Sequence, residues 1–305
     1  MKIVFMGTTD FSKIILEKLH KKYPVSLVVT QPDKKVGRKQ TIVFSPVKEL
    51  ALDLGIELFQ PERIKESYKK IVNLKPDVII TAAYGQIIPI EVINSSICLN
   101  VHGSLLPKRR GGAPVQRAIM EGDKTTGVTL MHMVYKMDAG DIIVQEEVKI
   151  EDNDTTTTLM DKLAHVGSKL LLDNLLAIID GSAPRIQQEE NAATFSYNLT
   201  LEDEIIDFNK PTSLVLRQLN GLLDEPGGAF YLKGERIKVY KLKKSDIIIS
   251  ATPGTVLSVN KELTIKTEDG AVDILEIQSS GKRRMNIKDY LNGQRLFQEG
   301  DVIDE

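Results

Sequence analysis

Cysteine, tryptophan and long hydrophobic runs are scarce or absent in this 305-residue sequence. The single cysteine, Cys98, excludes an intrachain disulfide and a metal site built from several cysteines. No apolar run approaches the length needed to cross a bilayer, and the N-terminus lacks a secretory pattern. The formal net charge is only −2, so contact with nucleic acid must come from local basic patches. We therefore expect a cytoplasmic protein with no membrane partner.

The first half of the chain alternates strand and helix patterns. Buried strands are predicted at residues 2–6, 25–30, 77–83 and 97–102, with helices between them. This alternation predicts an α/β fold with a Rossmann-like, open and mostly parallel sheet. We assign residues 1–184 to this domain.

The character of the sequence changes after Pro184. Residues 185–205 are rich in polar residues, including the run Gln187–Asn191, and this predicts a linker. A helix at about 211–222 then leads into five short strands, at 228–232, 236–243, 254–259, 262–267 and 272–278. Frequent turn signals between them predict a small OB-like β-barrel, so residues 206–305 form a C-terminal domain.

Asn100 and His102 are the first candidates for chemistry. Side chains two residues apart on a strand point to the same face, so this pair projects together. One offers an amide dipole and the other titrates near neutral pH, and the strand's carboxyl end is where parallel sheets bind ligands. Alternatively, a buried strand uses these polar groups only to satisfy neighbouring loops.

Asp138, in the turn Asp138-Ala139-Gly140-Asp141, is the third candidate. A carboxylate near His102 would stabilise the imidazolium and fix its tautomer, as acid–base catalysis requires. Aspartate is also common in glycine-containing turns for backbone hydrogen bonding alone. The spacing in the sequence does not show that Asp138 meets His102.

Three basic clusters suggest a polyanionic partner. The connection over residues 30–48 is long for its type and carries Lys34, Lys35, Arg38 and Lys39. A flexible basic segment at the carboxyl edge of a sheet can bind phosphates. The alternative interpretation is that this segment is only a solvated charged loop. The other clusters are residues 108–110 and 282–284.

Other polar features favour structural roles. The first strand-to-helix turn, from Gly7 to Phe11, lacks the three glycines of a dinucleotide fingerprint and is interpreted as a structural turn. His132 lies in an apolar strand and His165 on a long helix, so both are expected to be structural. Ser104 lacks the nucleophile elbow of serine hydrolases.

Several motifs of this chain occur together in one enzyme family. They are Asn100–Pro107, Arg110-Gly111, Ala113-Pro114, Gln116-Arg117, Thr126–Thr129 and Asp138–Asp141. Together they resemble the formyltransferases that use 10-formyltetrahydrofolate. Within that family, the segments Thr30–Asp33, Gly37-Arg38 and Ser45–Lys48 and the barrel domain are similar to the members that formylate the methionine on charged initiator tRNA.

The resemblance implies a role for each group of residues. The family's catalytic Asn, His and Asp fall on Asn100, His102 and Asp138, and its folate-contacting stretch falls on four consecutive residues, Ser104, Leu105, Leu106 and Pro107. Its tRNA-binding basic loop carries an Arg that matches Arg38, with Lys34, Lys35 and Lys39 beside it. The implied activity is transfer of a formyl group from the co-substrate 10-formyltetrahydrofolate, without a metal, by a monomer that takes part in translation initiation.

The sequence also departs from the family pattern. Arg109 stands where many members have tryptophan, and Thr9 stands where they have proline. These departures concern tRNA contact and loop packing and leave the catalytic set untouched. Two rival functions stay open on the residues alone: a formyltransferase or hydrolase of the same fold with another acceptor, and a non-enzymatic nucleic-acid-binding module.

Overall fold

The computed structural model describes residues 1–36, 40–260, 262–293 and 296–304. The chain divides into two compact units. Unit 1 comprises Met1–Pro114, Thr125–Lys149 and Leu159–Tyr197, and unit 2 comprises Val115–Lys124, Ile150–Thr158 and Asn198–Glu305. Residues 185–197, expected to be linker, therefore pack with unit 1.

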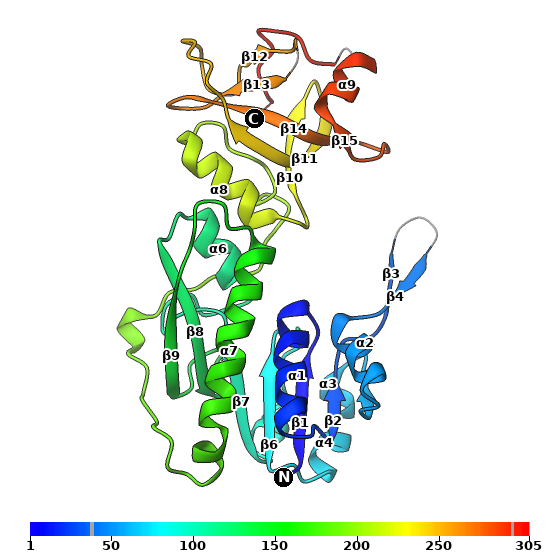
Figure 1. The fold of residues 1–305 in the computed structure, drawn as a ribbon, viewed down its shortest axis with the longest axis vertical. Coiled ribbons are helices and arrows are strands. Elements are labelled where there is room, and N and C mark those ends of the chain that lie inside the picture. The colour runs from blue at the N-terminus through cyan, green and yellow to red at the C-terminus, as the bar shows by residue number, and fades with distance from the viewer. Residues whose placement is uncertain (37–39, 261, 294–295, 305) are drawn as a thin grey trace. The chain divides into compact units, whose positions relative to one another are not determined.

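Unit 1 is built on a seven-stranded sheet with the order β5-β2-β1-β6-β7-β8-β9 (Figure 1). The strands are β1 (Ile3–Gly7), β2 (Leu27–Val29), β5 (Leu58–Phe59), β6 (Val78–Ala82), β7 (Ile97–His102), β8 (Thr125–His132) and β9 (Ile142–Lys149). The first five are parallel, whereas β8 runs antiparallel to both β7 and β9. This confirms the predicted Rossmann-like, mostly parallel sheet.

Helices cover both faces of this sheet. They are α1 (Asp10–Lys22), α2 (Pro46–Asp53), α3 (Ile64–Ser67), α4 (Lys69–Asn73), α5 (Ile90–Ile93) and α7 (Thr156–Ile179), whereas α6 (Pro114–Met120) belongs almost entirely to unit 2. A Cβ placed on Gly167 of α7 would meet Val101, Val128 and Ile15, so α7 and α1 share the face of Val101. The opposite face, with Cys98, packs against α3, α4 and α5. Asn100 and His102 share the face of Cys98, because side chains alternate along β7.

The turn after β1 is held by internal hydrogen bonds. The Ser12 hydroxyl accepts from the amides of Thr8 and Thr9 and donates to Ala82 O at 2.6 Å. A Cβ on Gly7 would lie 2.5 Å from Ser12 Cβ and 2.9 Å from Ala82 O, which explains the glycine. These bonds occupy the turn amides and support the structural interpretation of the turn.

The long basic connection contains a β-hairpin rather than an irregular loop. Strand β3 (Lys34–Val36) pairs antiparallel with β4 (Thr41–Val43) in the register Lys34↔Val43. Helix α2 follows, with the Ser45 side chain accepting from Lys48 N at its N-terminus. Gly37, Arg38 and Lys39 lie outside the described residues.

The C-terminal domain is an antiparallel sheet with the order β10-β11-β14-β13-β12, and β15 also pairs with β14 (Figure 1). Its elements are α8 (Thr212–Leu222), β10 (Gly228–Leu232), β11 (Glu235–Lys244), β12 (Val256–Ser258), β13 (Leu263–Lys266), β14 (Ala271–Ser279), β15 (Met285–Asn286) and α9 (Ile287–Gly293). Near the C-terminus, Asp304 bridges to Tyr231 and Val302 bridges to Thr255, which links the two edges of the curled sheet. The predicted barrel-like domain is confirmed.

One apolar core fills this domain. Phe230, Ile237 and Ile274 are fully buried there, with Val215 of α8 and Ile287 of α9 packed against them.

Among the described residues, no helix combines the length and the apolar character that a membrane crossing requires. A short 3-10 helix, Glu190–Ala192, interrupts the segment that precedes Tyr197.

Candidate active site

The candidate site lies at the carboxyl end of β7. In that strand Asn100 pairs with Thr81 of the parallel strand β6, and His102 pairs with Thr129 of the antiparallel strand β8. Because β7 pairs with a strand on each side, the backbone that carries these two side chains is fixed. They project from the same face of the sheet, as the sequence predicts.

Thr81 determines how the amide of Asn100 is turned. The Thr81 hydroxyl lies 2.9 Å from both Asn100 Oδ1 and Leu99 O. Asn100 Nδ2 then faces Asp138, with 3.4 Å between Nδ2 and Oδ1. The reversed amide would set its oxygen against a carboxylate, so the donor end points into the site.

His102 is almost fully buried, and its tautomer follows from its neighbours. Its Nε2 lies 3.1 Å from Arg109 O, and because a carbonyl oxygen can only accept, Nε2 carries a hydrogen. Nδ1 therefore faces the site, 3.8 Å from Asp138 Oδ1. That separation is longer than a hydrogen bond, and the pair attracts most strongly when Nδ1 is also protonated.

Asp138 reaches this pair from the segment between β8 and β9. Its backbone has φ 49°, a left-handed conformation that Asp and Asn adopt more readily than most residues. Gly111 N donates to Asp138 Oδ2 at 2.8 Å, which leaves Oδ1 toward Asn100 and His102. The structure thus brings Asn100, His102 and Asp138 together, although 36 positions separate the last two in the sequence (138 − 102).

The residues Ser104–Pro107 form a tight turn after β7. Ser104 Oγ donates to Lys108 O at 2.8 Å, and Thr129 Oγ1 donates to Ser104 O at 2.6 Å. The same Thr129 oxygen accepts from Leu106 N at 3.1 Å. Ser104 and Leu106 are buried, whereas Leu105 and Pro107 are half-buried. Any ligand contact of this stretch therefore falls first on Leu105, Pro107 and backbone atoms.

The basic residues that the sequence singles out differ in their exposure. Lys34 and Lys35 on β3 are exposed, as is Lys108. Arg110, which the sequence places in a basic cluster, has no exposed surface and pairs with Glu190 at 3.1 Å. It is therefore unable to meet an external phosphate, and that part of the prediction is wrong.

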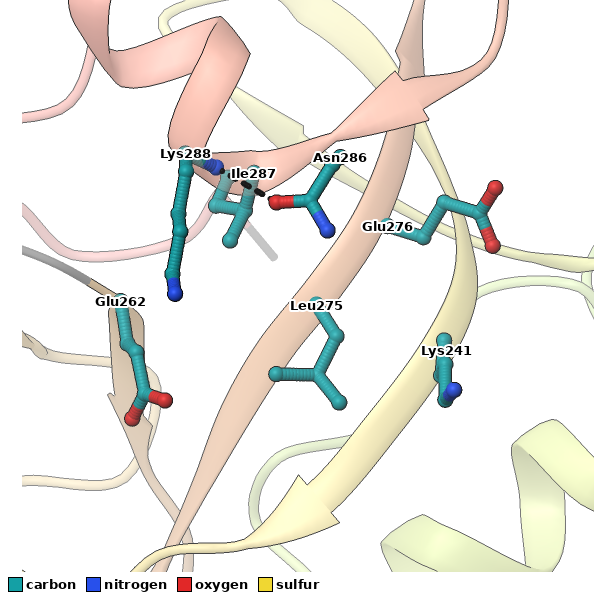
Figure 2. A pocket seen from close by; sticks show the side chains of 7 residues that line it. All are labelled: Lys241, Glu262, Leu275, Glu276, Asn286, Ile287 and Lys288. Atoms are coloured by element: carbon teal, nitrogen blue, oxygen red, sulfur yellow. Dashed lines mark hydrogen bonds between the residues drawn. The ribbon is translucent and has the colours of Figure 1, made fainter.

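A hollow of about 330 Å³ lies on the C-terminal domain (Figure 2). It is lined by Lys241, Glu262, Leu275, Glu276, Asn286, Ile287 and Lys288. Glu262 pairs with Lys243 at 2.9 Å and Glu276 with Arg284 at 2.7 Å. The lining thus carries two lysines and two glutamates, and both glutamates are paired with basic side chains. It belongs to unit 2, whereas the three candidate side chains belong to unit 1.

The remaining histidines take no part in this site. His132 ends β8, where burial is the main cause that lowers its pKa, with the charge of Arg185 second. His165 lies on the exposed side of α7 and faces Asp161. Within the described ranges, no three His, Cys, Asp or Glu side chains lie together as metal ligands do.

Sequence reasoning missed three residues that hold the site. Thr81 orients Asn100, Gln188 bonds to the segment that carries Asp138, and Arg110 bonds to Gln188. Thr81 lies near the end of a predicted strand that precedes the Asn100 strand, and that position was the available signal. Gln188 lies in a polar stretch that resembles any linker, so no local signal marked it.

Comparison with known proteins identifies the family. The formyl transferase family matches residues 1–175, and the formyl transferase C-terminal domain matches residues 198–295. A methionyl-tRNA formyltransferase of Latilactobacillus sakei is 45% identical over 298 residues, which cover 95% of this chain and 94% of that protein. One of Lactobacillus johnsonii is 44% identical over 311 residues, which cover 99% of each chain.

A solved structure shares the fold. HypX from Aquifex aeolicus in complex with tetrahydrofolic acid superposes with a TM-score of 0.67 at 20% identity. The match covers 100% of this chain and 51% of HypX, so this chain spans about half the length of that protein.

Proposed function

This chain belongs to the formyl transferase family, and on that premise we propose that it transfers the formyl group of 10-formyltetrahydrofolate to the methionine amine of charged initiator tRNA. The observation that carries the proposal is the convergence of Asn100, His102 and Asp138 at the end of β7. The product, formylmethionyl-tRNA, starts translation, so the reaction belongs in the cytoplasm.

Asn100 stabilises the charge that develops on the formyl oxygen. The amine nitrogen bonds to the formyl carbon, and a tetrahedral oxyanion forms before the bond from that carbon to N10 of the folate breaks. Thr81 turns Nδ2 of Asn100 into the site, where it can donate to this oxyanion. In comparable sites one such donor contributes about 3 kcal/mol.

His102 and Asp138 move the protons. The attacking amine loses one proton and N10 gains one, so the overall exchange is balanced. Nδ1 of His102 is the ring atom that faces Asp138, and when protonated it stabilises the oxyanion and supplies the proton to N10. Asp138 stabilises the imidazolium and orders a water that relays the proton from the amine. No covalent enzyme intermediate is needed.

The two substrates use different parts of the chain. The folate contacts the Ser104–Pro107 turn, chiefly through Leu105 and Pro107. The tRNA phosphates meet Lys34 and Lys35 on strand β3, together with Arg38 and Lys39 of the same basic segment. The C-terminal domain, residues 206–305, adds the exposed Lys282 and Arg283 and the lysines of the hollow in Figure 2. The catalytic domain is residues 1–184, and the chain acts as a monomer.

One assay tests the proposal directly. The protein is incubated with 10-formyltetrahydrofolate labelled in the formyl group and with methionyl initiator tRNA, and label in the tRNA is counted. Methionyl elongator tRNA and an amino sugar are the comparison acceptors. We expect label in the initiator tRNA and at least tenfold less in the others. Preferred labelling of the sugar, or of neither, would overturn the assignment.

A further inference from the structure

Gln188 uses its whole amide to connect three segments. Its Nε2 donates to Asp138 O at 2.8 Å and to Gly140 O at 2.7 Å. Its Oε1 accepts from Arg110 Nε at 3.1 Å and from Arg110 Nη2 at 2.9 Å. The side chain is buried, so no bulk water replaces these partners if they are lost.

Arg110 anchors Gln188 in turn. Its guanidinium has no exposed surface, and Nη1 pairs with Glu190 at 3.1 Å. Hydrogen bonds from Lys136 and then from Arg110 hold the pKa of Glu190 below its usual value, so the pair stays charged. The backbone of Arg110 is bound as well, since its N–H donates to Thr194 O and its carbonyl accepts from Ser196 N.

The same short segment also holds the carboxylate of Asp138. Gly111, the residue after Arg110, donates its N–H to Asp138 Oδ2 at 2.8 Å. The carbonyl of Asp138 is thus bound by Gln188, and its carboxylate is bound by Gly111, the residue next to Arg110. The ladder between β8 and β9 ends before Asp138, at the pair Met131↔Ile142, and does not fix its position.

We propose that Gln188 and Arg110 are positioning residues for Asp138, so that Gln188, which lies in a stretch predicted to be a linker, serves the catalytic site. The inference rests on the proposed function. Asp138 Oδ1 must stay near its 3.8 Å separation from His102 Nδ1. A misplacement of about 1 Å at a reacting group lowers the rate by about a hundredfold.

The substitution Gln188→Glu separates positioning from folding. Glutamate keeps an acceptor for the buried Arg110, and its charge complements the guanidinium. It has no N–H groups, so both bonds to Asp138 O and Gly140 O are lost. Gln187→Glu is the matched control, because it makes the same change at the adjacent, exposed residue.

The activity of both variants is measured in the formyl-transfer assay. We expect Gln188→Glu to lower kcat by about 10- to 100-fold, with KM for 10-formyltetrahydrofolate within about twofold of wild type. Gln187→Glu should match wild type. In an Asp138→Asn background, Gln188→Glu should lower kcat by less than about threefold, because residues that act through one group are not additive. Equal losses in both backgrounds would overturn the proposal.

A second measurement needs neither activity nor a substrate. In NMR spectra, the imidazole signals of His102, assigned with His102→Ala, should shift in Gln188→Glu and stay in place in Gln187→Glu. Unchanged His102 signals in Gln188→Glu would also overturn the proposal. If wild type proves inactive on methionyl-tRNA, the proposed function fails while this measurement still decides the positioning of Asp138.

Discussion

Asp138→Asn removes one charge from the site and the acceptor oxygen that faces Asn100 Nδ2. The backbone of Asp138 has φ 49°, which asparagine tolerates as well as aspartate does. The amide oxygen of asparagine can still accept from Gly111 N, so the segment keeps its anchor. The substitution therefore tests the carboxylate charge at an almost unchanged shape.

The distance to His102 determines the size of the expected effect. Asp138 Oδ1 lies 3.8 Å from His102 Nδ1. Two unit charges at that distance attract by about 4 kcal/mol at an effective dielectric constant of about 20. If the imidazolium develops in the transition state, losing this attraction slows the reaction by about a thousandfold. The Asp138 side chain is 15% exposed, so solvent weakens the attraction, and we expect a loss of kcat of about 100- to 1000-fold.

The assay is single-turnover formyl transfer with saturating 10-formyltetrahydrofolate and methionyl-tRNA, paired with a thermal melt. Asp141→Asn is the control in the same segment, because Asp141 forms a half-exposed ion pair with Arg185 at 3.0 Å, of a kind that contributes less than about 1 kcal/mol. The control should keep its rate. An Asp138→Asn enzyme within tenfold of wild type, with an unchanged melt, would refute the electrostatic role.

Three further predictions follow from packing, burial and charge. Gly140→Ala should lower the free energy of unfolding by about 1–3 kcal/mol, and also the rate, because the new Cβ would lie 1.9 Å from His132 O; Gly293→Ala, with no atom within 4 Å, is its control, and equal melts would contradict the steric argument. Burial raises the pKa of Cys98 to about 12, so at pH 8 alkylation of this only cysteine should follow unfolding; fast labelling of the folded protein would count against its burial. Arg38→Ala should raise KM for methionyl-tRNA and leave KM for the folate unchanged, and tRNA affinity should fall as salt rises; a salt-independent affinity would exclude phosphate contacts.

The secondary structure of this chain was predictable because its signals are local. The apolar run at β6 and the i, i+2 pair on β7 depend on a few adjacent residues, and the structure has both elements where the sequence indicates them. The hairpin of β3 and β4 was not predicted. Its strands have only three residues each, and the residues of β4 are exposed, so no buried pattern marks them.

The candidate site was only partly accessible from the sequence for a physical reason. Asn100 and His102 share a face by strand geometry alone, which local spacing encodes. The approach of Asp138 depends on hydrogen bonds from Gly111 and Gln188, which lie 27 and 50 positions away in the chain. Arg110 was misjudged because a cationic composition does not tell which side of the backbone a side chain occupies.

The arrangement of the site also bears on how an acceptor is chosen. Every primary amine that takes a formyl group presents the same nucleophile, so Asn100, His102 and Asp138 do not by themselves distinguish an aminoacyl amine from a sugar amine. A tRNA differs in the phosphate backbone behind the amine, and phosphates are bound by cations. In this chain exposed cations stand on other elements, among them Lys34 and Lys35 of β3 and Lys282 beyond β14. Selectivity for the acceptor should therefore change when these lysines are replaced, while the rate of the chemical step at saturating tRNA stays the same.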